Sequence, residues 1–260
     1  MIKKGKRLYE GKAKIVYATN DKNLAIQHFK DDATAFNNQK KATIEGKGIL
    51  NNRISEHILN NLGQIGIKNH LVKRLNMREQ LVHHVKIIPI EFIVRNIATG
   101  SLTKRLGIED GSVLERPLIE YCLKNDELGD PIVSREHILT FNWLNIVELD
   151  LISKELLRIN DFLQGMFRGI GIKLVDFKVE FGKTNENKII LADEISPDTC
   201  RLWDASTKKK LDKDRFRQNL GNLIEAYQEV ARRLGILHLE SNIRPIKFSK
   251  PTAVKLKKNK

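Results

Sequence analysis

The length and composition of this chain are those of an ordinary globular protein. It has 260 residues, of which 41% are hydrophobic and 30% are charged, enough for one large domain or two modest ones. No apolar run approaches the length of a membrane span, and the first residues lack the apolar segment of a signal peptide. Cys122 and Cys200 stand far apart without metal-ligand spacing, as expected of reduced cysteines. We therefore expect a cytoplasmic protein with no membrane partner.

The net charge of +14 suggests nucleic-acid binding, but its distribution weakens that interpretation. Residues 241–260 contain seven Lys or Arg residues and no acidic residue, so this basic tail carries half of the surplus. A terminal segment of this kind is usually solvated and mobile. No zinc-finger spacing or RNP-like strand occurs, and the remaining surplus suits anionic small molecules equally well. Nucleic acid is therefore not the partner that we expect.

The first third of the chain is predicted to be mainly β-sheet. Strand patterns occur within residues 6–30, 66–74 and 80–85, and apolar residues at helical spacing predict a helix at 49–62. Residues 31–48 are polar and contain glycine, which favours a long loop.

Two lysines follow a glycine turn near the N-terminus. Lys12 and Lys14 come after Gly11 and are two residues apart, so on a strand their side chains would share a face. Such a pair would hold a polyphosphate beneath a β-hairpin, although neither a P-loop motif nor G-x-G-x-x-G occurs in the chain. The alternative is a solvated strand edge that lysines protect from pairing.

A second candidate anion site follows the apolar strand predicted at 87–96. Arg95 stands near the end of this strand, and Ser101 is placed like the N-cap of a short helix at 102–106. An arginine beside the free amides of a helix start would bind phosphate. The alternative is a plain helix cap, with Arg95 paired to a carboxylate.

The rest of the chain is predicted to be richer in helix. Residues 121–131 favour a charged loop, and 149–167 form the pattern of a long amphipathic helix that ends at Gly169. Residues 195–204 are predicted to be irregular. A last helix is expected to begin at 212–215 and to end at Gly235.

Residues 174–182 alternate strictly between apolar and charged side chains, which predicts a half-buried strand. Asp176, Lys178 and Glu180 form its polar face. A turn centred between residues 186 and 187 would bring a second strand back and pair Glu180 with Asp193; a slip of one residue would bring Glu194 onto this face instead.

Two carboxylates on adjacent strands suit a Mg²⁺ ion that also holds nucleotide phosphates. On this interpretation Glu180 and Asp193 are the metal ligands. The alternative is an exposed sheet face on which the acidic residues form cross-strand pairs with Lys178.

Several motifs, in this order, resemble those of the SAICAR synthetase family. The resemblance covers Leu8 to about Leu237. It rests on Tyr-x-Gly-Lys-Ala-Lys from Tyr9, Ile-Pro-Ile-Glu-Phe-Ile-Val-Arg-Asn-x₃-Gly-Ser, Lys-Arg-Leu-Gly-Ile, Asp-Phe-Lys-Val-Glu-Phe-Gly, Asp-Glu-Ile-Ser-Pro-Asp, Cys-Arg-Leu-Trp-Asp and Asp-Lys-Asp-Arg-Phe-Arg.

The resemblance implies an α+β fold of two domains with ATP between them. We expect an antiparallel-sheet N-terminal domain of kinase-like character at residues 1–85, a larger α/β domain at 86–240 and the basic tail at 241–260. The implied activity joins L-aspartate to the carboxylate of the ribonucleotide CAIR, giving SAICAR, ADP and phosphate through an acyl phosphate, in IMP biosynthesis. A homodimer is also implied.

The resemblance also implies roles for individual residues. Lys178, Glu180 and Asp193 would be catalytic, and the last two would bind Mg²⁺. ATP phosphates would meet Lys12 and Lys14, with Lys124 matching a further position of the family. CAIR would be bound by Arg95, Ser101, Asp198, Arg201 and Arg217. A small-molecule kinase, with a stable phosphorylated product, is the alternative enzyme class.

Overall fold

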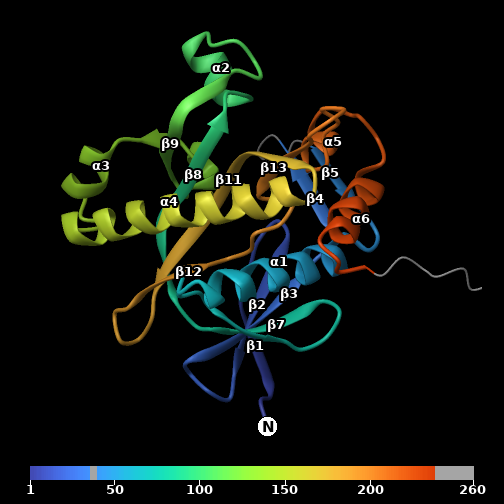
Figure 1. Cartoon of the computed structure of the whole chain (residues 1–260). Helices are drawn as coiled ribbons and strands as arrows, with labels where there is room; N and C mark the ends of the chain where they lie inside the picture. Colours follow the sequence, from blue (N-terminus) through green and yellow to red (C-terminus); the bar gives the residue numbers. More distant parts are fainter. Residues whose placement is uncertain (36–39, 238–260) are drawn as a thin grey trace, which may run out of the picture.

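The computed structural model describes residues 1–35 and 40–237, so the basic tail of the sequence lies outside the described part. Two antiparallel sheets and the helices that cover them make up the fold (Figure 1). Among the described residues, no helix is both long and apolar enough to cross a membrane.

The N-terminal part of the chain forms a five-stranded antiparallel sheet with the order β1-β2-β3-β7-β6. A separate two-stranded ribbon, β4–β5, follows β3. The bounds of these strands are β1 Lys4–Glu10, β2 Lys14–Thr19, β3 Leu24–Phe29, β4 Asp32–Ala35, β5 Lys40–Thr43, β6 Leu71–Arg74 and β7 Glu79–His83.

A six-stranded sheet follows in the chain, with the order β10-β9-β8-β11-β12 and β13 paired to β11. Its central strand β11 therefore has β8 along one edge, and β13 and then β12 along the other. The bounds are β8 Lys86–Ile97, β9 Val113–Leu123, β10 Ile132–Val133, β11 Ile172–Lys183, β12 Ile189–Ala192 and β13 Cys200–Asp204. The division of the chain at residue 85 stays a prediction.

The helices pack on the two sheets and between them. Helix α4 crosses the six-stranded sheet, and α2 lies at the far tip of the β8–β9 ribbon (Figure 1). Their bounds are α1 Lys47–Gln64, α2 Ser101–Leu106, the 3₁₀ turn Asp126–Leu128, α3 Arg135–Thr140, α4 Ile146–Gly169, α5 Asp214–Arg217 and α6 Leu223–Arg233.

Helix α4 shows why these residues form this element. Asn145 caps the first turn by accepting the backbone N–H of Glu148 at 2.9 Å, while Glu148 accepts the Asn145 N–H at 3.1 Å. Leu149, Ile152 and Leu156 begin a stripe that is fully buried against β11. The predicted helix is confirmed, and the cap places its start before residue 149.

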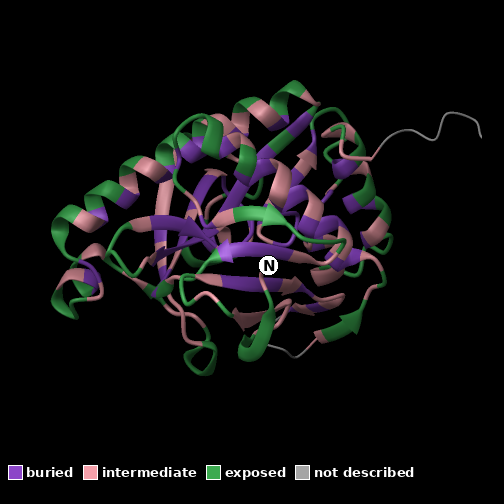
Figure 2. Ribbon diagram, turned by 90° about the horizontal axis from the view of Figure 1, so that it is seen from below, coloured by how far each residue is buried: buried purple, intermediate pink, exposed green. Residues whose placement is uncertain are grey.

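The core lies between α4, α1, α6 and the apolar face of the six-stranded sheet. Figure 2 shows the buried strands inside and the exposed helical surfaces outside. Phe177, Val179 and Phe181 of β11 are buried on this face, as the alternation predicts. The opposite, polar face is buried as well, since Asp176 and Glu180 are only 4% and 3% exposed. The alternative of an exposed charged face is therefore wrong about exposure, although the cross-strand pairing that it expected for Lys178 is present with Glu91.

The β11–β12 hairpin is confirmed, but its predicted register is wrong by one residue. Glu180 stands opposite Ala192, not Asp193. The loop has five residues, 184–188, because Thr184 and Lys188 close it by a backbone hydrogen bond of 2.9 Å and Asn187 adopts a positive φ. The turn is thus centred on Glu186, as in the one-residue slip that the sequence left open.

Several predicted loops contain regular structure. The loop expected at 31–48 holds the ribbon β4–β5, the irregular segment at 195–204 ends in β13, and the loop at 121–131 begins inside β9. Backbone pairing, which a short polar segment does not reveal, explains these errors. The single last helix is in fact α5 and α6, because residues 219–222 contain three positive φ angles that interrupt a helix.

Candidate functional site

A cluster of lysines and carboxylates gathers on the polar face of β11, where the two sheets meet. Lys14 of β2 pairs with Asp193 and, at 2.9 Å, with Glu194. These two acidic residues directly follow β12. Asp193 adopts a φ of 65°, a left-handed turn that ends the strand.

The same cluster continues along β8 and β11. Glu180 stands directly opposite Glu91, and like charges placed opposite each other are destabilising. Lys124 pairs with Glu180, and Lys178 pairs with Glu91, so two lysines offset this repulsion. Lys178 also lies 3.9 Å from Glu180. The lysine–carboxylate cluster therefore consists of Lys14, Lys124, Lys178, Glu91, Glu180, Asp193 and Glu194.

The mutual charges keep Lys14 and Asp193 ionised. Burial alone would lower the pKa of Lys14, but the negative charges of Asp193 and Glu194 outweigh it and raise that pKa. Burial would raise the pKa of Asp193, yet Lys14, Lys124 and Lys178 together lower it. Lys14 and Asp193 thus form a charged pair on the polar face of β11.

Lys12 does not join this cluster. It lies in the turn before β2, where Gly11 N–H donates to the Lys14 carbonyl at 2.8 Å. Its ammonium pairs with Asp126 at 2.7 Å. The expectation that Lys12 and Lys14 share a strand face is wrong, because β2 begins only at Lys14. A cavity of about 620 Å³ adjoins Lys12, between this turn and the β4–β5 ribbon.

Arginines and carboxylates alternate at the other end of the polar face. Asp176 is in register with Arg95 on β8 and with Arg201 on β13. One of its oxygens, Oδ2, accepts a hydrogen bond from each arginine at 2.7 Å. Further ion pairs extend this arrangement at both ends. The resulting arginine–carboxylate chain runs Arg105, Glu120, Arg95, Asp176, Arg201, Asp214, Arg217.

Ser101 contributes to this chain, but not as an N-cap. Gly100 is the capping residue of α2, and no side chain caps the helix. Ser101 Oγ instead accepts a hydrogen bond from Arg95 Nη2 at 3.3 Å. A Cβ on Gly100 would lie 2.8 Å from Arg201 Nη2, so this glycine leaves room for the guanidinium. The two arginines therefore converge on the start of α2.

Asp198 lies apart from this chain, in a buried group of its own. Its two oxygens accept from Lys47 and from the Tyr227 hydroxyl, each at 2.5 Å. Burial would raise the pKa of Asp198, but the charges of Lys47 and Lys213 lower it. The group joins the start of α1, the 193–199 segment and α6.

Comparisons with known proteins agree on one family. The family model described as SAICAR synthetase matches residues 7–234. The chain is 71% identical to the phosphoribosylaminoimidazole-succinocarboxamide synthase of Pelagibacter ubique over 260 residues, which cover 99% of this chain and 100% of that protein. This chain belongs to the SAICAR synthetase family. The enzyme of the same name from Rhodospirillum centenum is 63% identical, over 89% of this chain and 92% of its own.

Solved structures of the SAICAR synthetase family share this fold. The phosphoribosylaminoimidazole-succinocarboxamide synthase of Ehrlichia chaffeensis has a TM-score of 0.88 at 54% identity, and covers 90% of this chain and 100% of its own. A SAICAR synthetase solved in complex with ADP has a TM-score of 0.85 at 45% identity, and covers 87% of this chain and 96% of its own. The predicted α+β, SAICAR synthetase-like fold is thereby confirmed.

The predicted site residues of this member of the SAICAR synthetase family lie in four places. Lys14, Lys124, Lys178, Glu180 and Asp193 share the lysine–carboxylate cluster. The arginine–carboxylate chain contains the predicted Arg95, Arg201 and Arg217, and Ser101 is hydrogen-bonded to its Arg95. Lys12 and Asp198 lie outside both. Their roles in binding stay proposals.

The predicted site residues leave out five acidic residues of these clusters: Glu91, Glu120, Asp176, Glu194 and Asp214. Glu91 is four residues before Arg95 in a strand, and this even spacing could have placed both side chains on one face. Glu194 belonged to the alternative register. Asp176 stood on the predicted polar face without a role.

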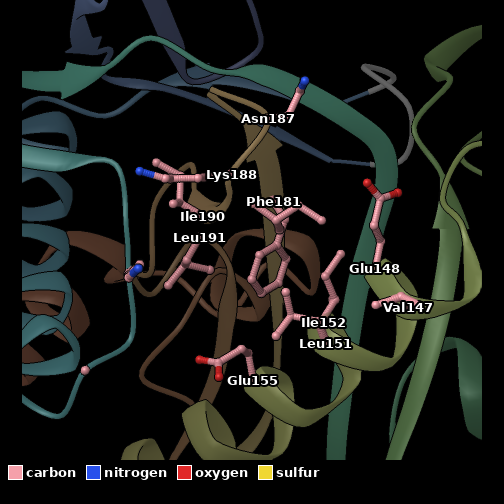
Figure 3. A pocket seen from close by; sticks show the side chains of 13 residues that line it. Val147, Glu148, Leu151, Ile152, Glu155, Phe181, Asn187, Lys188, Ile190 and Leu191 are labelled. Carbon is pink, nitrogen blue, oxygen red and sulfur yellow. The ribbon is translucent and has the colours of Figure 1, made fainter. Parts of the chain in front are cut away.

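A second cavity contains none of the predicted site residues. It measures about 430 Å³ and lies between α4 and the β11–β12 hairpin, with Ile152, Phe181 and Leu191 toward it and Glu148 and Glu155 around it (Figure 3). The candidate site is therefore the polar face of β11, and not this cavity.

Proposed function

We propose that this protein is the ATP-dependent ligase that joins L-aspartate to the carboxylate of CAIR, giving SAICAR, ADP and phosphate in IMP biosynthesis. The observation that carries the proposal is the polar face of β11. Asp176 stands in the arginine–carboxylate chain and Glu180 in the lysine–carboxylate cluster, about 13 Å apart at 3.3 Å per residue. One strand thus positions two anion sites, one for the phosphates of ATP and one for the phosphate of CAIR.

The lysine–carboxylate cluster suits the phosphates of ATP. In phosphoryl transfer, catalysis consists mainly of positioning and of neutralising the charge on the transferred group. Lys14, Lys124 and Lys178 are cations that would exchange their carboxylate partners for phosphate oxygens. Lys12, in its turn beside Asp126, would meet the same phosphates from the adjoining cavity.

The donor chemistry of this cluster fits Mg²⁺. Glu180 and Asp193 are hard oxygen donors, and the lowered pKa of Asp193 keeps it ionised. In the described part of the chain, no three His, Cys, Asp or Glu side chains are arranged to hold a metal ion by themselves. Mg²⁺ commonly takes one or two protein carboxylates and completes its shell with phosphates and water. When bound, it would neutralise charge on the phosphates.

The reaction that these sites serve must activate a carboxylate. A CAIR carboxylate oxygen would attack the γ-phosphorus of ATP, and ADP would leave. The aspartate amine would then attack the carbonyl carbon of this acyl phosphate, lose a proton, and release phosphate. Lys178, between Glu91 and Glu180, would offset the repulsion between the CAIR carboxylate and the γ-phosphate.

The arginine–carboxylate chain suits the phosphate of CAIR. Arg201 is the more exposed of the two arginines bound to Asp176. Arg217 shares Asp214 with Arg201, and Ser101 is bound to Arg95. Arg95 is buried and fully paired, so its part in CAIR binding would be to hold Asp176 and Ser101. Asp198 would face the imidazole or ribose. A homodimer and a cytoplasmic location remain part of this proposal.

The first prediction concerns turnover. The wild-type chain should form ADP only when ATP, CAIR and L-aspartate are all present, as a coupled assay would measure. Glu180→Gln and Asp193→Asn should each lower kcat by about 100-fold or more, because each would remove a charged oxygen ligand of the Mg²⁺ that neutralises the phosphates. Glu186→Gln is the matched control, since Glu186 lies in the exposed loop of the same hairpin.

Two results would contradict this proposal. ADP formation that needs CAIR but no amine would indicate a small-molecule kinase. Undiminished turnover in both variants would show that Glu180 and Asp193 do not belong to the site that holds the phosphates.

A further inference from the structure

One basic residue beside the arginine–carboxylate chain has no carboxylate partner. Lys213 is the residue at the start of α5. Its backbone N–H donates to the Pro197 carbonyl at 3.0 Å, which fixes it against the 193–199 segment. No hydrogen bond or ion pair of its ammonium occurs among residues 1–35 and 40–237. The side chain is nonetheless half-buried.

The carboxylates near Lys213 already have other partners. Asp212 accepts two backbone N–H groups, at 2.8 Å and 2.7 Å. Asp214 accepts from two arginines of the arginine–carboxylate chain. Asp198 has Lys47 and the Tyr227 hydroxyl. Among the described residues, these carboxylates bind other groups and not the Lys213 ammonium.

The environment of Lys213 disfavours its charge. Burial lowers the pKa of Lys213 to about 8, and the positive charges of Arg217 and Lys47 act in the same direction. Asp198 and Glu194 oppose this effect without cancelling it. An anion bound nearby would restore the charged form.

The charges of this region leave room for a dianion. The arginine–carboxylate chain has four arginines and three carboxylates, the Lys47–Asp198 pair is neutral, and Lys213 adds one charge, so two positive charges are in surplus. Asp212, whose pKa burial raises to about 7, carries about half a negative charge at pH 7 and lowers this surplus to about 1.5. A phosphate monoester carries about −1.5 to −2 charges at pH 7, which matches this surplus.

We propose that Lys213 is a further substrate-binding residue, which receives the phosphate of the ribonucleotide beside Arg201 and Arg217 and takes up a proton as it does so. This inference rests on the proposed function, since it takes CAIR as the ribonucleotide. It adds both a residue and a proton to the binding step.

The proton uptake has a defined pH range. Near pH 8 about half of the Lys213 side chains in the free protein are neutral, so phosphate binding should draw in up to about half a proton. At pH 6 the side chain is already charged and should contribute no uptake. If Lys213 binds the phosphate, its contribution to proton uptake should therefore appear at pH 8 and not at pH 6.

The test is isothermal titration calorimetry of the full chain with CAIR, in buffers of different ionisation enthalpy at pH 8 and pH 6. Lys213→Met should bind CAIR about 10- to 100-fold more weakly, the usual effect of losing a hydrogen bond to a charged group, and should lose the uptake at pH 8. Lys213→Arg should keep binding within a few-fold but lose the uptake, because a guanidinium stays protonated. Lys209→Met is the matched control, since Lys209 is exposed nearby.

Three outcomes decide the inference. Proton uptake at the wild-type level in both Lys213→Met and Lys213→Arg would overturn the inference. The same ribonucleotide without its imidazole carboxylate should draw in as much proton as CAIR, and loss of the uptake would overturn the assignment to the phosphate. Wild-type turnover is measured in parallel. Proton-coupled CAIR binding without turnover would refute the proposed function alone. Turnover together with unchanged CAIR affinity and proton uptake in the Lys213 variants would refute the role of Lys213 alone.

Discussion

A single carboxylate holds the arginine–carboxylate chain together. Asp176 is in register with an arginine on each neighbouring strand, and one oxygen accepts from both Arg95 and Arg201. Two guanidinium groups are thereby held side by side in a buried place, where their mutual repulsion would otherwise separate them. The sequence predicted both arginines but no role for Asp176, because the pairing of β13 with β11 was not visible in an irregular-looking segment.

Replacing Asp176 should therefore destabilise the whole protein. Asp176→Asn keeps the size of the side chain but leaves two buried guanidinium groups short of a negative charge. We expect the free energy of unfolding to fall by about 3 kcal/mol, as when one partner of a buried ion pair is removed. Urea denaturation followed by circular dichroism measures this change.

The matched control is Asp161→Asn on the exposed face of α4, which should change the unfolding free energy by less than about 0.5 kcal/mol. Equal stability of Asp176→Asn and wild type would mean that Asp176 does not hold the two arginines in solution.

At the scale of elements, β11 approaches its surroundings closely at one residue. A Cβ on Gly182 would lie 2.5 Å from Cγ2 of Val85, closer than two carbon atoms can pack. The pairing of β8 with β11 is irregular at this point, between Glu180 and Gly182. Glycine is therefore required where the chain passes from one sheet to the other.

Gly182→Ala should lower the free energy of unfolding by about 1 to 3 kcal/mol, since overpacking forces the backbone to move. Gly165→Ala is a matched control of opposite sign. Gly165 lies inside α4, and nothing stands within 4 Å of its added Cβ, so alanine should stabilise the helix by up to about 1 kcal/mol. Thermal denaturation of both variants measures the two shifts. A tolerated Gly182→Ala would show that β8 can yield at this point.

At the scale of the whole molecule, buried polar contacts join parts that are distant in the sequence. Leu191 of β12 exchanges backbone hydrogen bonds with Lys68 and His70, at 3.0 Å and 2.8 Å, which ties the six-stranded sheet to the N-terminal part. Lys47, only 1% exposed, reaches from the start of α1 to Asp198, which also binds Tyr227 of α6. These contacts fix the lysine–carboxylate cluster between the two sheets.

Lys47→Met should consequently lower the free energy of unfolding by about 3 kcal/mol at pH 7, because it leaves a buried carboxylate without its cation. Lys154→Met, on the exposed side of α4, is the control and should have almost no effect. Chemical denaturation at several pH values gives a second test.

The sign of the pH dependence follows from Asp198. Its pKa is lowered in the folded protein, so its contribution to stability is present above the ordinary pKa of an aspartate and is lost as the pH falls below about 4. The difference between wild type and Lys47→Met should therefore shrink on acidification. A difference that stays constant down to pH 3 would contradict the buried ion pair.

Much of this molecule could be predicted from the sequence, and the limits have physical causes. Period-2 alternation and helical stripes identified β11, α1 and α4, since burial of one face dictates these patterns. The register of β11 with β12 could not be predicted, because the loop between them can close with five residues, as it does at 184–188, as readily as with an even number of residues. The separation of Lys12 from Lys14 depended on where β2 begins, a boundary that propensity does not define.

Strand β11 has an edge that two different strands share. β13 covers residues 172–177 and β12 covers 180–183, so the ladder is interrupted at Lys178, whose N–H donates to Thr199 of the connecting segment at 2.8 Å. The segment that bridges this interruption carries Asp193, Glu194 and Asp198. Segment 193–199 is thus anchored at both ends by sheet hydrogen bonding while its middle makes no ladder. The gap in the ladder admits a buried loop that carries Glu194 and Asp198, while the strands on both sides of the gap keep their pairing.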